Sequence, residues 1–155
     1  MLPVDSSRLY RNYSRQHGIN VDQEPHYNID NWLNPASLDY KPEVAQAVFY
    51  YTACAEKEDR LCVCIHTHDM KTTAWKYAHR NQLILDGTFG ICNSRMLLFI
   101  ALGVDGFGKG IPLACFLFSA PTGSQATHHA GYDSTILEKI LKAWKQSLGS
   151  RSRSG

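Results

Sequence analysis

The chain has 155 residues and a mass of 17.5 kDa, with 44% hydrophobic residues, 19% charged residues and a formal net charge of +2. This length suits one domain, which can bury roughly 68–70% of the surface of its unfolded chain, so a long disordered chain is excluded. The longest apolar run, Met96 to Val104, has about half of the ~20 residues of a membrane-spanning helix, so we expect no membrane span. The N-terminus lacks the pattern of a signal peptide, and we expect an intracellular protein.

Cysteine usage and charge distribution give two further expectations. The five cysteines are an odd number without a C-x-x-C pair, which predicts free and mostly buried thiols; they are Cys54, Cys62, Cys64, Cys92 and Cys115. The residues from 139 to 155 carry five cations and no carboxylate. Such an end can attract polyanions, although a solvated helix face followed by a frayed tail explains the charges equally well.

The first half of the chain predicts an irregular segment followed by helices. Residues 1–40 mix aromatic residues and turn formers without a steady period, which indicates an irregular lead-in with a short helix around Ser6–Arg15. Pro42 then suits the first turn of a helix, and apolar residues recur at spacings of three and four. We therefore expect a helix over about 42–57.

A short strand and a second helix are expected next. The run Arg60–His66 is rich in β-branched and sulfur-containing residues and is too short for a helix, so it predicts a strand. Thr67 can cap the helix that follows, which we expect over Asp69–His79.

Three apolar runs predict an antiparallel meander of three strands. The second and third runs are joined by a glycine-rich segment, Asp105–Gly110, that suits a hairpin turn. Because these strands are apolar on both faces, we expect helices on each side of the sheet. The runs are Gln82–Ile91, Arg95–Val104 and Gly110–Ser119.

The clearest helix follows a polar loop. Asp133 is a candidate N-cap, an apolar stripe runs from Ile136 to Leu148, Glu138 and Lys142 can pair, and Gly149 ends the pattern. The fold class is therefore α/β of the α+β kind: a three-strand antiparallel meander plus helices, with a helical N-terminal region.

Asp86 is the most informative polar position. It lies among Leu83, Ile84, Leu85 and Phe89, so burying its carboxylate would be costly unless a cation, a metal or several donors met it. The alternative is an aspartate at the end of a strand that hydrogen-bonds to a turn formed by the next two residues.

A family resemblance enters at these residues. The segments Trp75–His79 and Leu85–Gly90, followed by the strands at 97–105 and 110–118, resemble the start of the catalytic domain of Mutator-like (MULE) transposases. These domains belong to the ribonuclease-H-like DDE group of transposases and integrases. The similarity covers roughly residues 66–148, and its most specific part is the Leu-Asp-Gly-Thr block followed by two apolar strands.

The resemblance implies metal-dependent DNA cleavage and strand transfer in the nucleus. Two Mg²⁺ (or Mn²⁺) ions bind the scissile phosphate in such sites, and hard ions of this kind prefer carboxylate oxygens. Asp86 matches the first acid of the family's triad, as a catalytic residue and metal ligand. The implied organisation is a lead-in over 1–40, a helical region with one short strand over 41–80, a partial ribonuclease-H-like domain over 81–149 and a disordered tail over 150–155.

The second and third acids of the family have no match. Asp105 is expected in the hairpin turn and Asp133 as a helix cap, and one carboxylate cannot hold two divalent ions. We therefore expect a truncated, inactive fragment of a transposon-derived transposase. A missing strand would leave 83–91 as an open apolar edge that promotes self-association or partner binding, unless the strand at 61–66 covers it. The alternative is a non-enzymatic module that binds protein or nucleic acid.

Other residue patterns are weaker. Cys62, Cys64, His66 and His68 alternate, but four ligands along one strand cannot converge on a tetrahedral ion, which leaves a two-histidine metal site of His66 and His68 as an alternative. The adjacent histidines His128 and His129 are expected in a solvated turn. The three tryptophans, Trp32, Trp75 and Trp144, are expected to lie far apart as packing anchors.

Overall fold

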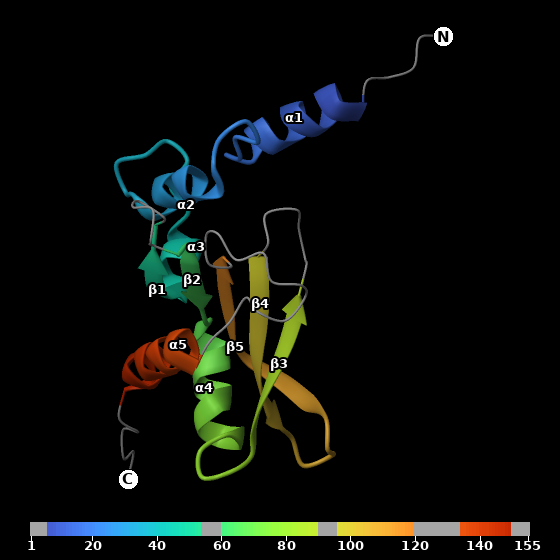
Figure 1. The fold of residues 1–155 in the computed structure, drawn as a ribbon, viewed down its shortest axis with the longest axis vertical. Helices are drawn as coiled ribbons and strands as arrows, with labels where there is room; N and C mark the ends of the chain where they lie inside the picture. The colour runs from blue at the N-terminus through green and yellow to red at the C-terminus, as the bar shows by residue number, and fades with distance from the viewer. Residues whose placement is uncertain (1–5, 54–59, 90–95, 120–133, 150–155) are drawn as a thin grey trace. The chain divides into compact units, whose positions relative to one another are not determined.

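The computed structural model describes residues 6–53, 60–89, 96–119 and 134–149, which divide between two compact units, Met1–Ala45 and Gln46–Gly155 (Figure 1). None of the described helices has the length and apolar character needed to span a membrane. The elements in chain order are α1 Ser6–Gln16, α2 Pro25–Leu33, α3 Pro42–Ala47, β1 Val48–Thr52, β2 Cys62–Ile65, α4 His68–Tyr77, β3 Leu83–Phe89, β4 Met96–Val104, β5 Gly110–Ser119 and α5 Ser134–Leu148.

The first unit contains α1, which was predicted, and α2, which was not. Pro25 occupies the first turn of α2, where its fixed φ and missing N–H are tolerated. Buried Asn28 closes the loop before this helix: its side chain accepts from the Asn20 backbone N–H (2.8 Å) and donates to the Asn20 carbonyl (2.9 Å). The indole of Trp32 donates to the Gly18 carbonyl (2.8 Å). Side-chain hydrogen bonds of this kind leave no periodic signal in the sequence.

The second unit is built on a five-stranded sheet in the order β1-β2-β5-β4-β3, in which all neighbours are antiparallel. The predicted meander of β3, β4 and β5 is confirmed. The hairpin of β1 and β2 extends the sheet beyond β5 to five strands, with Cys64 opposite Phe116. The protein therefore has the α+β fold class that the sequence predicted.

The predicted helix over 42–57 is wrong, because the chain turns from α3 into β1 at Val48. The segment Val48-Phe49-Tyr50-Tyr51-Thr52 consists of β-branched and aromatic residues, which favour strands when a partner strand is present. That partner is β2, where Cys64 lies opposite Tyr50. The pairing of β1 with β2 thus overrides the helical spacing of the apolar residues.

Three local predictions are confirmed. The Thr67 side chain accepts from the Met70 backbone N–H (3.2 Å) and caps α4. In the β4–β5 turn, the Asp105 carboxylate accepts from the backbone N–H groups of Phe107 (2.9 Å) and Lys109 (2.8 Å). Gly149 has a φ of +69° after the end of α5. The proposed cap Asp133 and the tail 150–155 lie outside the described residues.

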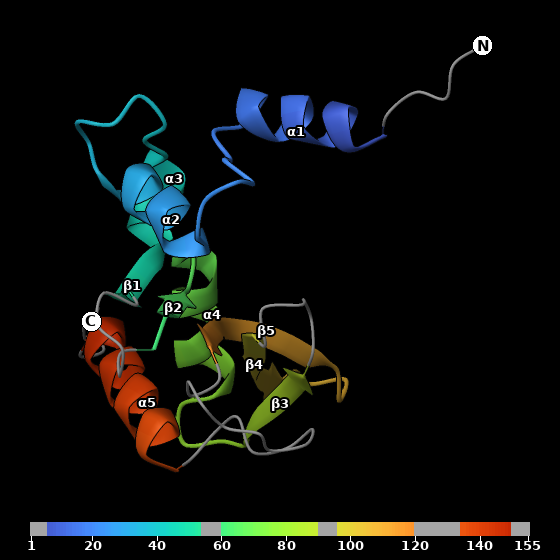
Figure 2. The same cartoon turned by 45° about the horizontal axis from the view of Figure 1, so that its top comes forward.

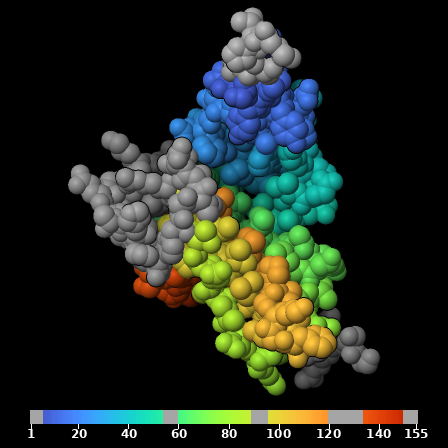
Figure 3. All heavy atoms as spheres, turned by 90° about the vertical axis from the view of Figure 1, so that its right-hand side faces the viewer, coloured from blue at the N-terminus to red at the C-terminus, as the bar shows by residue number. Residues whose placement is uncertain are grey.

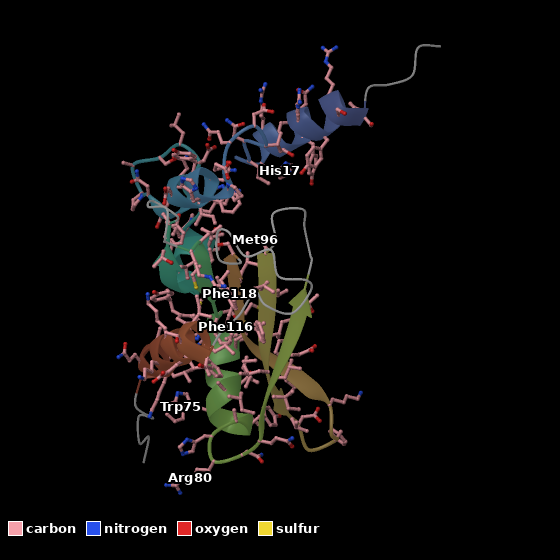
Figure 4. The ribbon with its side chains drawn as sticks, in the orientation of Figure 1. His17, Trp75, Arg80, Met96, Phe116 and Phe118 are labelled. Atoms are coloured by element: carbon pink, nitrogen blue, oxygen red, sulfur yellow. The ribbon has the colours of Figure 1, made fainter. Side chains whose placement is uncertain are left out.

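The core lies between one face of the sheet and the helices α4 and α5 (Figures 1 and 2). Phe99 stacks on Phe118 with ring centroids 5.7 Å apart, and Phe116 meets Trp144 edge-on at 5.9 Å. Figure 4 shows Phe116 and Phe118 in this layer. The other buried members are Cys62, Cys64, Ala74, Leu97, Ala101, Leu113, Ala114 and Ile140.

The expectation of helices on both faces of the sheet is wrong for the described part of the chain. Register shows that the residues covered by α4 and α5 alternate along β4 with Leu98, Ile100 and Leu102, which are only half-buried. These residues share their face with Ile65, which is 36% exposed. Apolar residues on both faces therefore do not distinguish a fully covered sheet from one covered on a single face.

We expect Gly87→Ala to lower the free energy of unfolding by about 1–3 kcal/mol, although alanine is otherwise better than glycine in a strand. An added Cβ would lie 2.9 Å from Cε1 of Phe99, whose ring packs beneath β3. Chemical denaturation measures the loss, and Phe99→Leu should relieve part of it in the double variant. Gly106→Ala, with nothing within 4 Å, is the control and should change stability by less than about 0.5 kcal/mol. An equal loss in both variants would contradict the packing at Gly87.

Candidate functional site on the open sheet edge

Asp86 occupies the middle of β3, opposite Ile100 of β4. β3 is one of the two edge strands of the sheet, at the end opposite to β1, and pairs only with β4 among the described strands. The strand β2 pairs with β1 and β5 and does not cover this edge. Figure 3 looks at this side of the sheet and shows β3, in yellow-green, at the surface. The predicted open edge is therefore confirmed for the described residues.

The expectation of a buried Asp86 carboxylate is wrong, because this residue is exposed. Gly87 lies over Phe99 on the face that α4 and α5 cover, so its neighbour Asp86 belongs to the opposite face. No described strand lies on its outer side, and water reaches it. Because Asp86 is exposed, its carboxylate does not need a neutralising cation. Its position on the open edge instead makes the carboxylate accessible from solvent.

The alternative of a strand-end aspartate is also wrong. Gly87 and Thr88 do not form a turn but continue β3, opposite Phe99 and Leu98. On the face of Asp86, its strand neighbours are Ile84 and Thr88, and its partner across the ladder is Ile100. The sheet around Asp86 thus presents one carboxylate, one hydroxyl and apolar side chains.

The edge itself is apolar at its start. Leu83, Ile84 and Leu85 are 41%, 37% and 36% exposed, which is unusual for three consecutive large apolar residues in a strand. Edge strands present unpaired backbone N–H and C=O groups, and charges on an edge suppress unwanted pairing. Asp86 is the one charged residue of β3.

The other acids do not join Asp86 in the described structure. Asp105 is used in the β4–β5 turn, where its carboxylate accepts two backbone hydrogen bonds. Asp133 lies outside the described residues. Within the ranges 6–53, 60–89, 96–119 and 134–149, no group of three or more histidine, cysteine or acidic residues could hold a metal ion.

Cys62 and Cys64 of β2 and His66, which follows the strand, are buried, whereas His68 is not. Sγ of Cys62 lies 3.7 Å from Sγ of Cys64 in the core, and the hydrogen bond between them, together with burial, raises the pKa of Cys64. His66 is buried beside Phe49, with ring centroids 4.8 Å apart. His68 is an exposed residue of the first turn of α4. Of the other cysteines, Cys115 is a half-buried free thiol, and 54 and 92 lie outside the described residues, as does the histidine pair at 128–129.

One cavity was not foreseen. The sequence predicted that Trp75 and Trp144 lie far apart, but both line a cavity between α4 and α5, together with Arg80 and Lys145. Their separation of 69 positions hides this proximity. The sequence placed Trp144 in the apolar stripe of the last predicted helix, but it gave no signal that brings Trp75 beside it.

No protein-family model, curated protein or solved structure matches this chain.

Stability should depend on His66 below neutral pH. Burial and the nearby Lys71 lower the pKa of His66 from its ordinary value of 6.5, so the unfolded chain binds more protons than the folded chain in this range. The contribution of neutral His66 to the free energy of unfolding is fully present above about pH 6.5. It is lost as the pH drops from 6.5 through the lowered pKa of the folded state. We expect His66→Phe to lose less thermal stability than the native chain on acidification.

Thermal unfolding at a series of pH values measures this dependence. His68→Phe is the matched control, because His68 is exposed, and it should behave as the native chain does. An unchanged acid sensitivity in His66→Phe would contradict the assignment.

Proposed function

We propose that the second unit is part of the catalytic domain of a Mutator-like transposase, and that Asp86 supplies one ligand for a divalent metal ion at a DNA-cleaving site. The observation that supports the proposal most is the position of Asp86: the middle of the first strand of an antiparallel meander, exposed on an open edge. The order of strand, acid and meander is the one that the family resemblance implies. DNA in the nucleus is the corresponding substrate.

The described residues fit this metal only in part. A carboxylate has the hard oxygen atoms that Mg²⁺ and Mn²⁺ prefer, and exposure leaves room for water ligands. Ile84, Thr88 and Ile100 add no second carboxylate beside Asp86. A single carboxylate gives weak binding, so the described residues do not form a two-ion centre. The proposal therefore assigns Asp86 as one contributor, and we expect no DNA cleavage by this chain alone.

Paramagnetic Mn²⁺ tests the assignment without requiring activity. We expect millimolar Mn²⁺ to broaden the NMR signals of Asp86 and its neighbours in β3 more than those of other strands, because the effect decreases steeply with distance from the ion. Asp86→Asn should remove this local broadening by deleting the charge while keeping a similar shape. Excess Mg²⁺ should reverse it.

Asp105→Asn is the matched control, because the amide oxygen can still accept the hydrogen bonds of the turn. Broadening near residue 86 should remain in this variant. A native chain whose broadening avoids β3, or persists there in Asp86→Asn, would contradict the proposal. A DNA-nicking assay in the same buffer should show no metal-dependent cleavage.

A second candidate function is supported by the exposed apolar residues of β3. A non-enzymatic module could pair this edge with a strand of another chain, using the free backbone groups for affinity and Leu83, Ile84 and Leu85 for contact. A second copy of this chain is the simplest partner, since antiparallel pairing of two identical edges is self-complementary.

We expect Ile84→Lys to reduce concentration-dependent self-association several-fold in analytical ultracentrifugation, because a lysine on an edge strand opposes pairing. Ile65→Lys is the control. Ile65 has nearly the same exposure, 36% against 37%, and lies on the same sheet face, but it belongs to an inner strand. Equal effects of the two variants would show that the sheet face, and not the edge, mediates association. A native chain that stays monomeric throughout would contradict the second function.

A further inference from the structure

A cavity of about 530 Å³ opens between the C-terminal halves of α4 and α5, beside the start of β3. This volume lies within the range of about 300–1,000 Å³ that is usual for small-molecule sites. Its apolar wall comes from three parts of the chain. Trp75 lies in α4 and Ala78 directly follows that helix, Leu141 and Trp144 belong to α5, and Leu83 begins β3.

The two tryptophans give the wall its aromatic character. The indole N–H of Trp75 donates to the Leu148 carbonyl (3.3 Å), which ties α4 to the end of α5. The Trp75 ring also lies 5.1 Å from the His79 ring, centroid to centroid. Trp144 packs against Phe116 in the core. A ligand in this cavity would therefore meet ring surfaces, and its apolar part would be aromatic or aliphatic.

The charged residues of the wall are all cations. Arg80 and Lys145 are exposed at the cavity, and none of the described residues that line it is a carboxylate. The nearest acid on α5, Glu138, lies two turns before Lys145 and pairs with Lys142. The acid of α4, Asp69, is in the first turn of that helix, at the opposite end from the cavity.

Two helix C-termini also reach this cavity, since α4 ends at Tyr77 and α5 at Leu148. Each helix end carries about half a negative charge, so together they offset roughly one of the two full positive charges. The balance remains positive. Arg80 has a φ of +59°, a region that glycine or asparagine usually occupies, so a cationic side chain is present where the backbone favours a smaller residue. Figure 4 shows Trp75 and Arg80 at this end of α4.

We propose that this cavity binds a small amphiphilic anion, an aryl or alkyl carboxylate or sulfonate. Its apolar part lies between Trp75, Leu83 and Trp144, and its anionic group interacts with Arg80 and Lys145. This site is separate from Asp86, which lies on the sheet face opposite to α4 and α5.

Naphthalene-2-sulfonate is a suitable probe, and the neutral naphthalene-2-sulfonamide is its isosteric control. Each is titrated into the full chain while the three indole N–H signals are followed by NMR. We expect saturable shifts of the Trp75 and Trp144 signals with the sulfonate, a much smaller change at Trp32, and affinity for the sulfonamide that is lower by about fivefold or more.

Variants separate charge recognition from apolar adsorption. Lys145→Gln should weaken sulfonate binding about fivefold and leave sulfonamide binding unchanged, since it removes one exposed charge. Lys109→Gln, in the β4–β5 turn and outside the cavity wall, should change neither. Ala78→Leu fills the cavity and should weaken both compounds; the dispersed NMR spectrum of each variant verifies that it is folded.

Three results would overturn the proposal. The first is the absence of saturable shifts at Trp75 and Trp144 with the sulfonate. The second is equal affinity for the sulfonate and the sulfonamide. The third is an equal effect of Lys145→Gln and Lys109→Gln on sulfonate binding.

Discussion

The aromatic layer of Phe99, Phe116, Phe118 and Trp144 joins the sheet to α5 and determines which sheet face is covered. This layer also restricts the residue at one position of β3, the position opposite Phe99. The Phe99 ring lies beneath β3 and leaves space only for a glycine opposite it, which is Gly87. Because successive side chains of a strand point to opposite faces, the preceding Asp86 belongs to the uncovered face. Core packing thus places the single charge of β3 in water.

Local signals in the sequence predicted the individual helices, strands and turns better than they predicted which elements lie side by side in the fold. The Thr67 cap, the Asp105 turn and the meander depend on residues close together in the chain, and each was predicted. The change from α3 to β1 at Val48 was missed because it depends on pairing with β2. The exposure of Asp86 was missed for a different reason: the open edge was predicted, but helices were expected on both faces of the sheet, whereas α4 and α5 cover the face opposite to Asp86.

An exposed Asp86 changes the physical basis of the candidate site. The carboxylate does not need a metal to remain stable, so its possible function depends on access from the open edge and not on an unmet charge. The same edge presents Leu83, Ile84 and Leu85, which a second strand would cover. Metal binding and strand addition are therefore connected, because any strand that joins β3 lies directly beside Asp86. The cavity near Trp75 and Trp144 is on the covered face and is chemically independent of this edge.

Hydrogen exchange of the backbone amides of β3 tests the open edge most directly. In an antiparallel pair, alternate residues of an outer strand direct their N–H groups away from the partner. The account predicts that the amides of β3 alternate between slow and fast exchange, while those of residues 97–103 in β4 and 115–118 in β5, which are paired on both sides, exchange slowly throughout. Uniformly slow exchange along Leu83–Phe89 in the monomeric chain would mean that another segment covers this edge, and would contradict the placement of Asp86.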